Sequence, residues 1–503
     1  MNDSASLKQK TMIGLFWSFA DLMANHGIQF IIQILLARIL LPEHFGIIGM
    51  IIVFIALSES IVDSGFTQAL IRDQNTSQAD YSTVFHFNLF VAIVMYVLLF
   101  ISAPIISVFF EEPQLISIIR ILSLVLIINS LGIIQKVMLV KNIDFRTITK
   151  VSVIAVIVSG SVTITFALLG FGVWSLVINI ITMQLVQTIL FWFFNKWMPS
   201  LTFSIQSFKK FFRFGYKLLL SGLIDTFYNN LYYLIIGRLY STSQLGFYTN
   251  AVKIRDLASQ SIAAAVQRVS YPILSSIQED ERRLKAGFRK IIKMSGFINF
   301  PLMVGLSAIA TPLFGLLLGE KWLPSVVYFQ LLCFAGMLYP LHAVNLNILQ
   351  VKGRSDLFLL IEIIKKSVLT ILIVVSLLFE LGIIGLIGAA VLNSYISLFI
   401  NTYFSAKEIS YSAKEQMKDL VPIFIISIFM GLVVFMFGKV LPLTYFWLLI
   451  VQVIIGISIY ILLSKLARIS ELGILYQMIF EIFMKARTAM QKISSRKTLG
   501  GSE

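Results

Sequence analysis

Charged side chains interrupt a strongly apolar stretch at residues 251–271, which reads AVKIRDLASQSIAAAVQRVSY. With the 3.6-residue period of a helix, one face about 120° wide collects the polar side chains, and only Arg255 points elsewhere. That face consists of Lys253, Asp256, Gln260, Gln267, Arg268 and Tyr271. Charged residues at bilayer depth usually face a bundle interior or a water-filled cavity, because a charge in hydrocarbon is costly. The candidate ligands for an anionic, polar substrate are therefore Lys253, Arg255, Gln260, Gln267 and Arg268.

Three other apolar stretches carry polar side chains on one face. Their members are Ser18, Asp21, Asn25 and Gln29; Glu59, Ser60, Asp63 and Thr67; and, 200 residues after the first set, Ser221, Asp225 and Asn229. The amides add Asn25, Gln29 and Asn229 to the substrate-binding candidates. The carboxyl groups are candidates for binding a coupling ion, because acids inside a membrane often mark proton and cation relays. These acids are Asp21, Glu59, Asp63 and Asp225.

Each of these residues also has a purely structural interpretation. Lys253 and Arg255 lie near the start of their stretch, where long side chains are able to extend to the membrane interface. Arg268 lies deeper and would pair with a carboxylate such as Asp63. Asp21 and Asp225 would be buried acids kept neutral by desolvation. The sequence leaves these alternatives open.

The elements that must position these residues are membrane helices. The 503-residue chain is 58% hydrophobic and only 13% charged, and its apolar runs are long enough to cross about 30 Å of hydrocarbon. We predict an all-α, multi-pass membrane protein with about fourteen transmembrane helices. The predicted spans are residues 12–37, 46–70, 81–109, 115–140, 148–169, 172–194, 213–239, 246–277, 286–318, 323–350, 356–380, 382–404, 420–440 and 442–464.

The formal charge of +15 follows from the loops. Basic residues are concentrated in the N-terminus, in alternate loops and in the C-terminal tail, so the orientation rule for membrane helices explains them better than nucleic-acid binding does. Both termini are therefore expected in the cytoplasm. The densest cluster, ERRLKAGFRKIIK at 281–293, is expected to contact anionic membrane lipids.

The two halves of the chain repeat each other. The segments at 37–50 (ARILLPEHFGIIGM) and 237–250 (GRLYSTSQLGFYTN) align Arg38 with Arg238 and Gly46 with Gly246. Repeats of several spans are typical of secondary transporters, whose substrate path lies at the repeat interface. The expected domains are an N-terminal six-helix bundle at 1–195, a cytoplasmic linker at 196–212, a second six-helix bundle at 213–405, two additional transmembrane helices at 406–465 and a basic cytoplasmic tail at 466–503.

Several local sequences resemble one family of membrane proteins. They are LLARILLPEHFGIIGM from 35, IVDSGFTQALIRD from 61, KNIDFRTIT from 141, GFGVWSLV from 170 and IIGRLYSTSQLGFYTNAVKI from 235. In these segments the chain is similar to the bacterial polysaccharide-export flippases of the multidrug/oligosaccharidyl-lipid/polysaccharide exporter superfamily, in the branch of colanic-acid and teichuronic-acid exporters. The resemblance covers the first twelve spans.

This resemblance implies a fold and an activity. The fold would be two pseudo-symmetric six-helix bundles around a central cavity lined by spans 1, 2, 7 and 8, plus two C-terminal helices. The activity would be alternating-access movement of undecaprenyl-diphosphate-linked oligosaccharide repeat units from the inner to the outer leaflet of the bacterial inner membrane, for capsule, O-antigen or exopolysaccharide assembly. Other polysaccharide-assembly proteins would be further partners. No single motif defines the family, so the resemblance implies cavity placement only.

Other functions make different demands on the sequence. A drug/cation antiporter of the same superfamily should have an acidic cavity, and Lys253, Arg255 and Arg268 argue against one. A membrane-embedded polysaccharide polymerase or glycosyltransferase should present larger loops than the short external segments FEEPQ and LGFGV. A scaffold without transport activity would not need polar stripes on symmetry-related helices.

The sequence offers no pattern for a cofactor. The four histidines, His26, His44, His86 and His342, lack metal-ligand spacing, and no GxxxxGK[ST] phosphate loop occurs. Cys333 is the only cysteine, so no intrachain disulfide forms. We therefore expect no metal, no other cofactor, no nucleic-acid partner and no enzyme activity.

Overall fold

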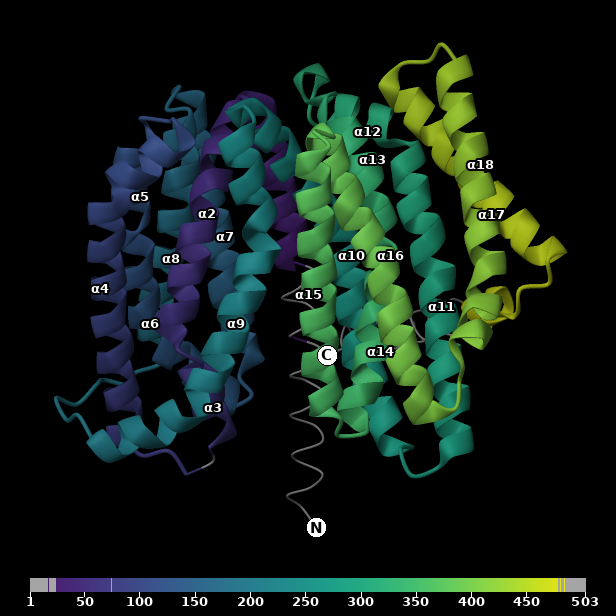
Figure 1. Cartoon of the computed structure of the whole chain (residues 1–503). Helices are drawn as coiled ribbons and strands as arrows, with labels where there is room; N and C mark the ends of the chain where they lie inside the picture. Colours follow the sequence, from purple (N-terminus) through teal and green to yellow (C-terminus); the bar gives the residue numbers. More distant parts are fainter. Residues whose placement is uncertain (1–16, 18–23, 74, 478–479, 481–483, 485–503) are drawn as a thin grey trace, which may run out of the picture. The chain divides into compact units, whose positions relative to one another are not determined.

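The protein is built from α-helices. The computed structural model describes residues 17, 24–73, 75–477, 480 and 484, and these residues form helices joined by short loops, with no β-strand among them (Figure 1). The predicted all-α, multi-pass class is thus confirmed. By its contacts the chain divides into two compact units. Unit 1 contains Met1–Asn250 and Leu317–Ser325, and unit 2 contains Ala251–Leu316 and Val326–Glu503.

Unit 1 begins, in the described chain, with a helix over residues 24–39. It continues with α2 (Pro42–Asp63), α3 (Phe66–Arg72), α4 (Gln78–Phe110), α5 (Leu115–Leu122), α6 (Leu124–Lys141), α7 (Phe145–Leu168), α8 (Val173–Phe194), α9 (Ile205–Leu239), the first turns of α10 (Thr242–Ser276) and the short helix η1 (Glu320–Trp322). Helix α2 packs against α4 and α9, while α6 and α7 pack against α8.

Unit 2 contains the remainder of α10 and the helices that follow it. They are α11 (Glu281–Ala308), α12 (Ala310–Leu317), α13 (Ser325–Gly336), α14 (Tyr339–Val351), α15 (Ser355–Leu378), α16 (Gly382–Ile409), α17 (Ala413–Val440) and α18 (Tyr445–Leu466). Residues 470–477 form a further helical segment. Helix α11 packs against α14 and α17, α15 against α16, and α17 against α18.

Ten helical segments of the described chain are long and apolar enough to cross a membrane. They are Pro42–Arg72, Gln78–Phe110, Leu115–Lys141, Phe145–Leu168, Val173–Phe194, Glu281–Ala308, Ser325–Val351, Gly382–Ile409, Ala413–Val440 and Tyr445–Leu466. The other four predicted spans coincide with residues 24–39, α9, α10 and α15, which are also helical. Charged residues interrupt the apolar sequence of α9, α10 and α15. A total of fourteen spans therefore stays a prediction.

Four predicted spans consist of two helices each. Breaks separate α2 from α3, α5 from α6, α11 from α12 and α13 from α14. At the first break Ser64 and Gly65 have φ angles of 47° and 70°, a left-handed conformation that glycine adopts without strain. A Cβ atom on Gly65 would lie 2.7 Å from the carbonyl oxygen of Gly215. The break therefore forms where α9 passes too closely for a larger residue.

The repeat seen in the sequence also has a structural counterpart within unit 1. Gly46, in the first turns of α2, and Gly246, in the first turns of α10, lie at a close crossing. A Cβ atom on Gly46 would lie 1.8 Å from the carbonyl oxygen of Thr242, and one on Gly246 would lie 1.9 Å from that of Pro42. The equivalent glycines thus allow the two equivalent helix starts to pack backbone to backbone.

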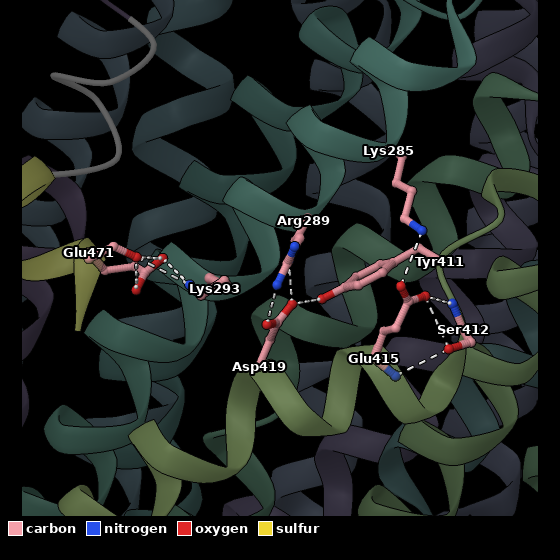
Figure 2. Close-up of polar contacts among 9 residues, drawn as sticks. Lys285, Arg289, Lys293, Tyr411, Ser412, Glu415, Asp419 and Glu471 are labelled. Atoms are coloured by element: carbon pink, nitrogen blue, oxygen red, sulfur yellow. Dashed lines mark hydrogen bonds and ion pairs between the residues drawn. The ribbon is translucent and has the colours of Figure 1, made fainter. Parts of the chain in front are cut away.

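Ion pairs join the start of α17 to the start of α11 within unit 2 (Figure 2). Arg289 donates to Asp419 through Nε at 2.6 Å and through Nη2 at 2.7 Å. The buried Tyr411 hydroxyl donates to the same carboxylate at 2.5 Å. Lys285 Nζ lies 3.2 Å from Glu415 Oε1. Since α18 packs on α17, these contacts fix the last two long helices to α11.

Candidate functional site

A polar pocket of about 680 Å³ lies among α2, α3, α6, α8 and α9 of unit 1. Its size falls in the range of about 300–1,000 Å³ that is usual for ligand pockets. The polar residues in its wall are Glu59, Ser60, Asp63, Thr67, Asn129, Lys136, Gln184, Gln187, Thr226, Asn229 and Asn230. Such a concentration of amide, hydroxyl and charged groups among apolar helices indicates a binding site, because packing alone would favour apolar side chains.

Asn129 connects three helices across one side of this pocket. Its Nδ2 atom lies 3.5 Å from Glu59 Oε1 on α2, and its Oδ1 atom accepts a 3.0 Å hydrogen bond from Gln184 Nε2 on α8. Helix α8 is close enough for this contact because α6 has a glycine at the crossing. A Cβ atom on Gly132 would lie 3.0 Å from Thr188 Oγ1.

Asp63 occupies the last position of α2, directly before the break. Its Oδ1 atom accepts a hydrogen bond from the Thr67 hydroxyl and another, at 3.3 Å, from the Thr67 backbone N–H in the first turn of α3. The break at Ser64 and Gly65 therefore turns the chain so that the Asp63 carboxylate accepts a hydrogen bond from a backbone N–H at the start of α3, which has no partner within its own helix. Lys136 contributes an ammonium group to the same pocket from α6.

A hydrophobic cluster behind the pocket holds these helices in place. It contains Phe66, Ala69 and Leu70 of α3, Val84 and Phe85 of α4, Ile134 and Val137 of α6, and Phe211 of α9. Because α6 turns one face to this cluster, its other face presents Asn129 and Lys136 to the pocket.

The structure brings three of the predicted site residues of unit 1 together. Glu59, Asp63 and Asn229 all line the pocket. Asn25 is half-buried and Gln29 is exposed on the helix at 24–39, and neither belongs to the pocket wall. Asp225 is exposed on α9, one turn before Asn229, and also lies outside the wall. The predicted acid Asp21 lies outside the described residues.

Arg255 occupies a different environment, in the interior of unit 2. Its side chain is 10% exposed, and its Nη1 atom donates a 2.7 Å hydrogen bond to the Tyr339 hydroxyl. Its Nε atom lies 2.7 Å from Asp256 Oδ1. The aliphatic part of Arg255 also passes over Gly336, where a Cβ atom would lie 2.9 Å from Arg255 Cδ. Arg255 therefore contacts both sides of the break between α13 and α14.

Two further side chains satisfy the carbonyl groups freed by that break. The Ser259 hydroxyl donates to the carbonyl oxygen of Gly336, and Asn299 Nδ2 donates to those of Gly336 and Met337 at 3.2 and 2.8 Å. Polar residues of α10 and α11 thus replace the missing backbone bonds, as a broken membrane helix requires.

The other candidates of the 251–271 stretch lie on the remaining sides of α10. Lys253 is half-buried, whereas Gln260, Gln267 and Arg268 are exposed on the surface of unit 2. The structure therefore separates Arg255 from the residues that share the polar face of the helical wheel. Among the described residues, no group of three or more His, Cys, Asp or Glu side chains is arranged for a metal ion.

Sequence reasoning did not identify Asn129, Lys136, Gln184 or Gln187 as residues of this wall. The signal was present but weak. Asn129 and Lys136 are seven residues apart, and Gln184 and Gln187 are three apart, so each pair lies on one helix face. In helices that are otherwise apolar, amides at this spacing indicate a shared polar wall.

Comparison with known proteins agrees with this architecture. The lipid II flippase MurJ in an inward closed conformation superposes with a TM-score of 0.73 at 17% identity, covering 90% of this chain and 98% of MurJ. An inward-facing multidrug resistance MATE family transporter of the MOP superfamily superposes with a TM-score of 0.61 at 16% identity, covering 77% of this chain and 94% of that one. The fold is therefore that of multi-pass membrane transporters.

Sequence comparison defines the family within that class. The profile of the family described as "Polysaccharide biosynthesis protein" matches residues 35–327, and the chain belongs to this family. It is 27% identical over 354 residues to the teichuronic acid biosynthesis protein TuaB of Bacillus subtilis (strain 168), covering 70% of this chain and 73% of TuaB. It is 26% identical over 400 residues to the lipopolysaccharide biosynthesis protein WzxC of Escherichia coli (strain K12), covering 78% of this chain and 81% of WzxC.

Proposed function

We propose that the protein is a flippase that moves undecaprenyl-diphosphate-linked oligosaccharide repeat units from the inner to the outer leaflet, for capsule, O-antigen or exopolysaccharide assembly. The observation that carries this proposal is the polar pocket of unit 1, in which eight of the lining residues have amide or hydroxyl side chains. Membership of the polysaccharide biosynthesis family supports it. So does the similarity to proteins named for teichuronic acid and lipopolysaccharide biosynthesis.

The pocket has the chemistry that a glycan needs. Amide and hydroxyl groups both donate and accept hydrogen bonds, so they complement sugar hydroxyls without adding charge. The isoprenoid tail stays in lipid while the polar part crosses, and the site is exposed to each side in turn as the two repeats move. Translocation makes or breaks no covalent bond, so the protein is proposed to have no enzyme activity.

The proposal includes a location and an orientation. The protein would lie in the bacterial inner membrane with both termini in the cytoplasm, because the basic loops are placed as the orientation rule requires. Its two six-helix bundles would be residues 1–195 and 213–405, joined by the cytoplasmic linker at 196–212, with the additional helices at 406–465 and the tail at 466–503. Anionic membrane lipids and other polysaccharide-assembly proteins would be its partners.

One observation favours a second function. The pocket of unit 1 has two carboxyl groups, those of Glu59 and Asp63, but only one ammonium group, that of Lys136. An excess of acids suits a cation, and a MATE transporter shares the fold. A drug/cation antiporter is therefore the alternative, with an organic cation in place of the glycan.

Reconstitution in liposomes tests the two functions against each other. Lipid-linked oligosaccharides are incorporated on both leaflets, and an impermeant glycan-modifying reagent reports how fast the inner pool reaches the outer leaflet. The proposal predicts complete modification with the protein and about half without it, whereas an imposed cation gradient should drive no uptake of a fluorescent organic cation. Cation uptake without glycan exposure would establish the antiporter instead.

A matched pair of variants connects the activity to the pocket. Asn129→Ala removes the amide that contacts Glu59 and Gln184, whereas Asn142→Ala removes the same group from an exposed position after α6. We expect flipping to slow about tenfold in the first variant, as loss of one or two substrate hydrogen bonds implies, and to stay unchanged in the second. Equal rates in both variants would separate transport from this pocket.

A further inference from the structure

A second pocket, of about 550 Å³, lies in unit 2 at the start of α11. Five of its lining residues are cationic, and we call them the basic stripe: Arg282, Lys285, Arg289, Lys290 and Lys293. The other lining residues are Ala286 and a single acid, Glu471. At 3.6 residues per turn, all five cations fall on one side of α11, so the positive charge is concentrated along one line.

Three cations of the basic stripe are already paired. Lys285 pairs with Glu415, Arg289 with Asp419, and Lys293 with Glu471 at 2.7 Å (Figure 2).

The other two have no such partner. Arg282 and Lys290 are both exposed, and neither side chain forms an ion pair with another residue of the described chain. They lie about 12 Å apart along the helix axis, within the combined reach of two long, flexible side chains. The pocket therefore retains two positive charges available to an anion.

The position of the basic stripe along α11 identifies the kind of anion. The apolar part of this span begins after Lys293, and residues 294–317 provide the roughly 20 residues that crossing the hydrocarbon needs. The stripe thus lies beyond the end of the apolar segment, at the level of the lipid headgroups. Phosphate groups of anionic lipids are the anions concentrated there.

The segment that provides Glu471 has the features of an interfacial helix. Residues 470–477 follow α18 after a short turn, and Leu472 is buried while Tyr476 is 54% exposed. Phe480 is 65% exposed. Exposed aromatic side chains next to a membrane span favour the headgroup region, where one end of the ring is apolar and the other is wet. A soluble anion would not require these side chains, but a lipid would contact them.

We propose that the basic stripe is a binding site for the headgroup of an anionic phospholipid, with Arg282 and Lys290 as the ligands of its phosphate. The lipid would also contact the segment at 470–477, which forms the opposite side of the pocket through Glu471. This site is distinct from the pocket of unit 1. The proposal rests on the proposed function and deepens it, because it gives a site to the anionic membrane lipids proposed there as partners, and this lipid is not transported.

Native mass spectrometry of the full chain in detergent tests the site. Phosphatidylglycerol is titrated onto the wild type, onto an Arg282→Ala/Lys290→Ala variant and onto a Lys407→Ala/Lys439→Ala control, which removes two exposed cations from elsewhere in unit 2. We expect binding to weaken about 30-fold in the first variant. Each basic residue near an anionic headgroup contributes about 1 kcal/mol of binding free energy, so removing two costs about 2 kcal/mol, which corresponds to about 30-fold in affinity. The control should bind as the wild type does.

Two competition arms distinguish the possible sources of the phosphate. Phosphatidylcholine and soluble glycerol phosphate are each added at the concentration of phosphatidylglycerol, and neither should displace it. Displacement by glycerol phosphate would show a site for free phosphate, and undiminished lipid binding by the Arg282→Ala/Lys290→Ala variant would place the lipid elsewhere. Either result overturns the proposal. Thermal unfolding of each variant verifies folding, and Lys290→Gln alone replaces the double variant if that one is unstable.

Discussion

Arg289 and Asp419 form an ion pair through two parallel hydrogen bonds, of 2.6 and 2.7 Å, between α11 and α17. The Arg289 side chain is 52% exposed, but the Asp419 side chain is only 10% exposed. Burial, followed by the contact with Asp419, raises the pKa of the Tyr411 phenol, so this group stays protonated and donates its hydrogen bond. The pair thus anchors α17 to α11.

Replacing Arg289 should weaken this anchor. In Arg289→Ala, the largely buried carboxylate of Asp419 loses the cation that neutralises it and keeps only the hydrogen bond from the Tyr411 hydroxyl. We expect a loss of about 1–2 kcal/mol in the free energy of unfolding, measured by thermal unfolding in detergent. The control is Lys439→Ala, at the other end of α17. If the two variants unfold alike, the ion pair does not stabilise the protein.

Unit 1 contains a pH-dependent contact beside α3. Lys210, followed by the backbone N–H of Asn75, holds the pKa of Asp73 below its usual value. A carboxyl group whose pKa is lowered on folding stabilises the protein above its unfolded pKa of about 4, and this contribution disappears as the pH falls through the folded pKa.

Asp73→Asn should therefore reduce stability at pH 7, and this loss should shrink as the pH falls below about 4 toward the folded pKa of Asp73. The loss should stay below about 1 kcal/mol because Lys210 is half exposed. The melting temperatures of the wild type and the variant, compared from pH 7 to below about pH 4, should converge as the pH falls. A constant difference between them would mean that the ion pair is not the cause.

The loop before α11 tests the orientation. In a Cys333→Ser background, single cysteines at the exposed positions Ser276 and Arg283 should react with an impermeant thiol reagent only from the cytoplasm. A cysteine at Lys439 should react only from outside. Reversal of this labelling pattern would place both termini on the outer side.

Hydropathy and periodicity predicted much of this molecule, because both depend on local sequence. Every predicted span coincides with helix in the described residues, apart from short breaks and span ends. The polar stripe of α2 indicated Glu59 and Asp63, which do line a pocket. In each case the residues that make the pattern are neighbours on a single helix, so no knowledge of the tertiary structure was needed.

The helix breaks and the other pocket walls depend on residues far apart in the chain. The turn at Gly65 forms against Gly215, and Arg255 finds its partner at Tyr339. No periodic pattern in the sequence indicates either of these contacts. Asn129 was missed for a similar reason, because its partners Glu59 and Gln184 lie on two other helices. Tertiary contacts, rather than helix propensity, decide these features.

The acids of the unit 1 pocket lead to a prediction about energy coupling. If Glu59 or Asp63 carries a coupling proton, Glu59→Gln or Asp63→Asn should stay folded but transport independently of an imposed pH gradient. Asp225→Asn is the matched control, because Asp225 is exposed outside the pocket wall. The measurement is the flipping rate in liposomes with and without the gradient. An unchanged gradient response in both pocket variants would exclude proton coupling through these two acids.

The two arginines of the opening stretch should respond differently to loss of charge. Arg255 is buried between Asp256 and Tyr339, so Arg255→Gln leaves Asp256 without its cation and frees the contacts at the break between α13 and α14. Breaking a buried ion pair on one side costs about 3–5 kcal/mol. We therefore expect a strong fall in melting temperature and in membrane abundance.

Arg268 is exposed on α10, so Arg268→Gln should fold normally. If Arg268 binds the diphosphate of the substrate, this variant should flip lipid-linked oligosaccharides several-fold more slowly, because a charge-assisted hydrogen bond is about twice as strong as a neutral one. Lys253→Gln should behave in the same way. Both abundance and flipping rate must be measured, since only their combination separates a structural arginine from a substrate-binding one. Full activity of Arg268→Gln and Lys253→Gln would rule out both residues as diphosphate ligands, and the amides of the unit 1 pocket would then remain as the candidates for substrate contact.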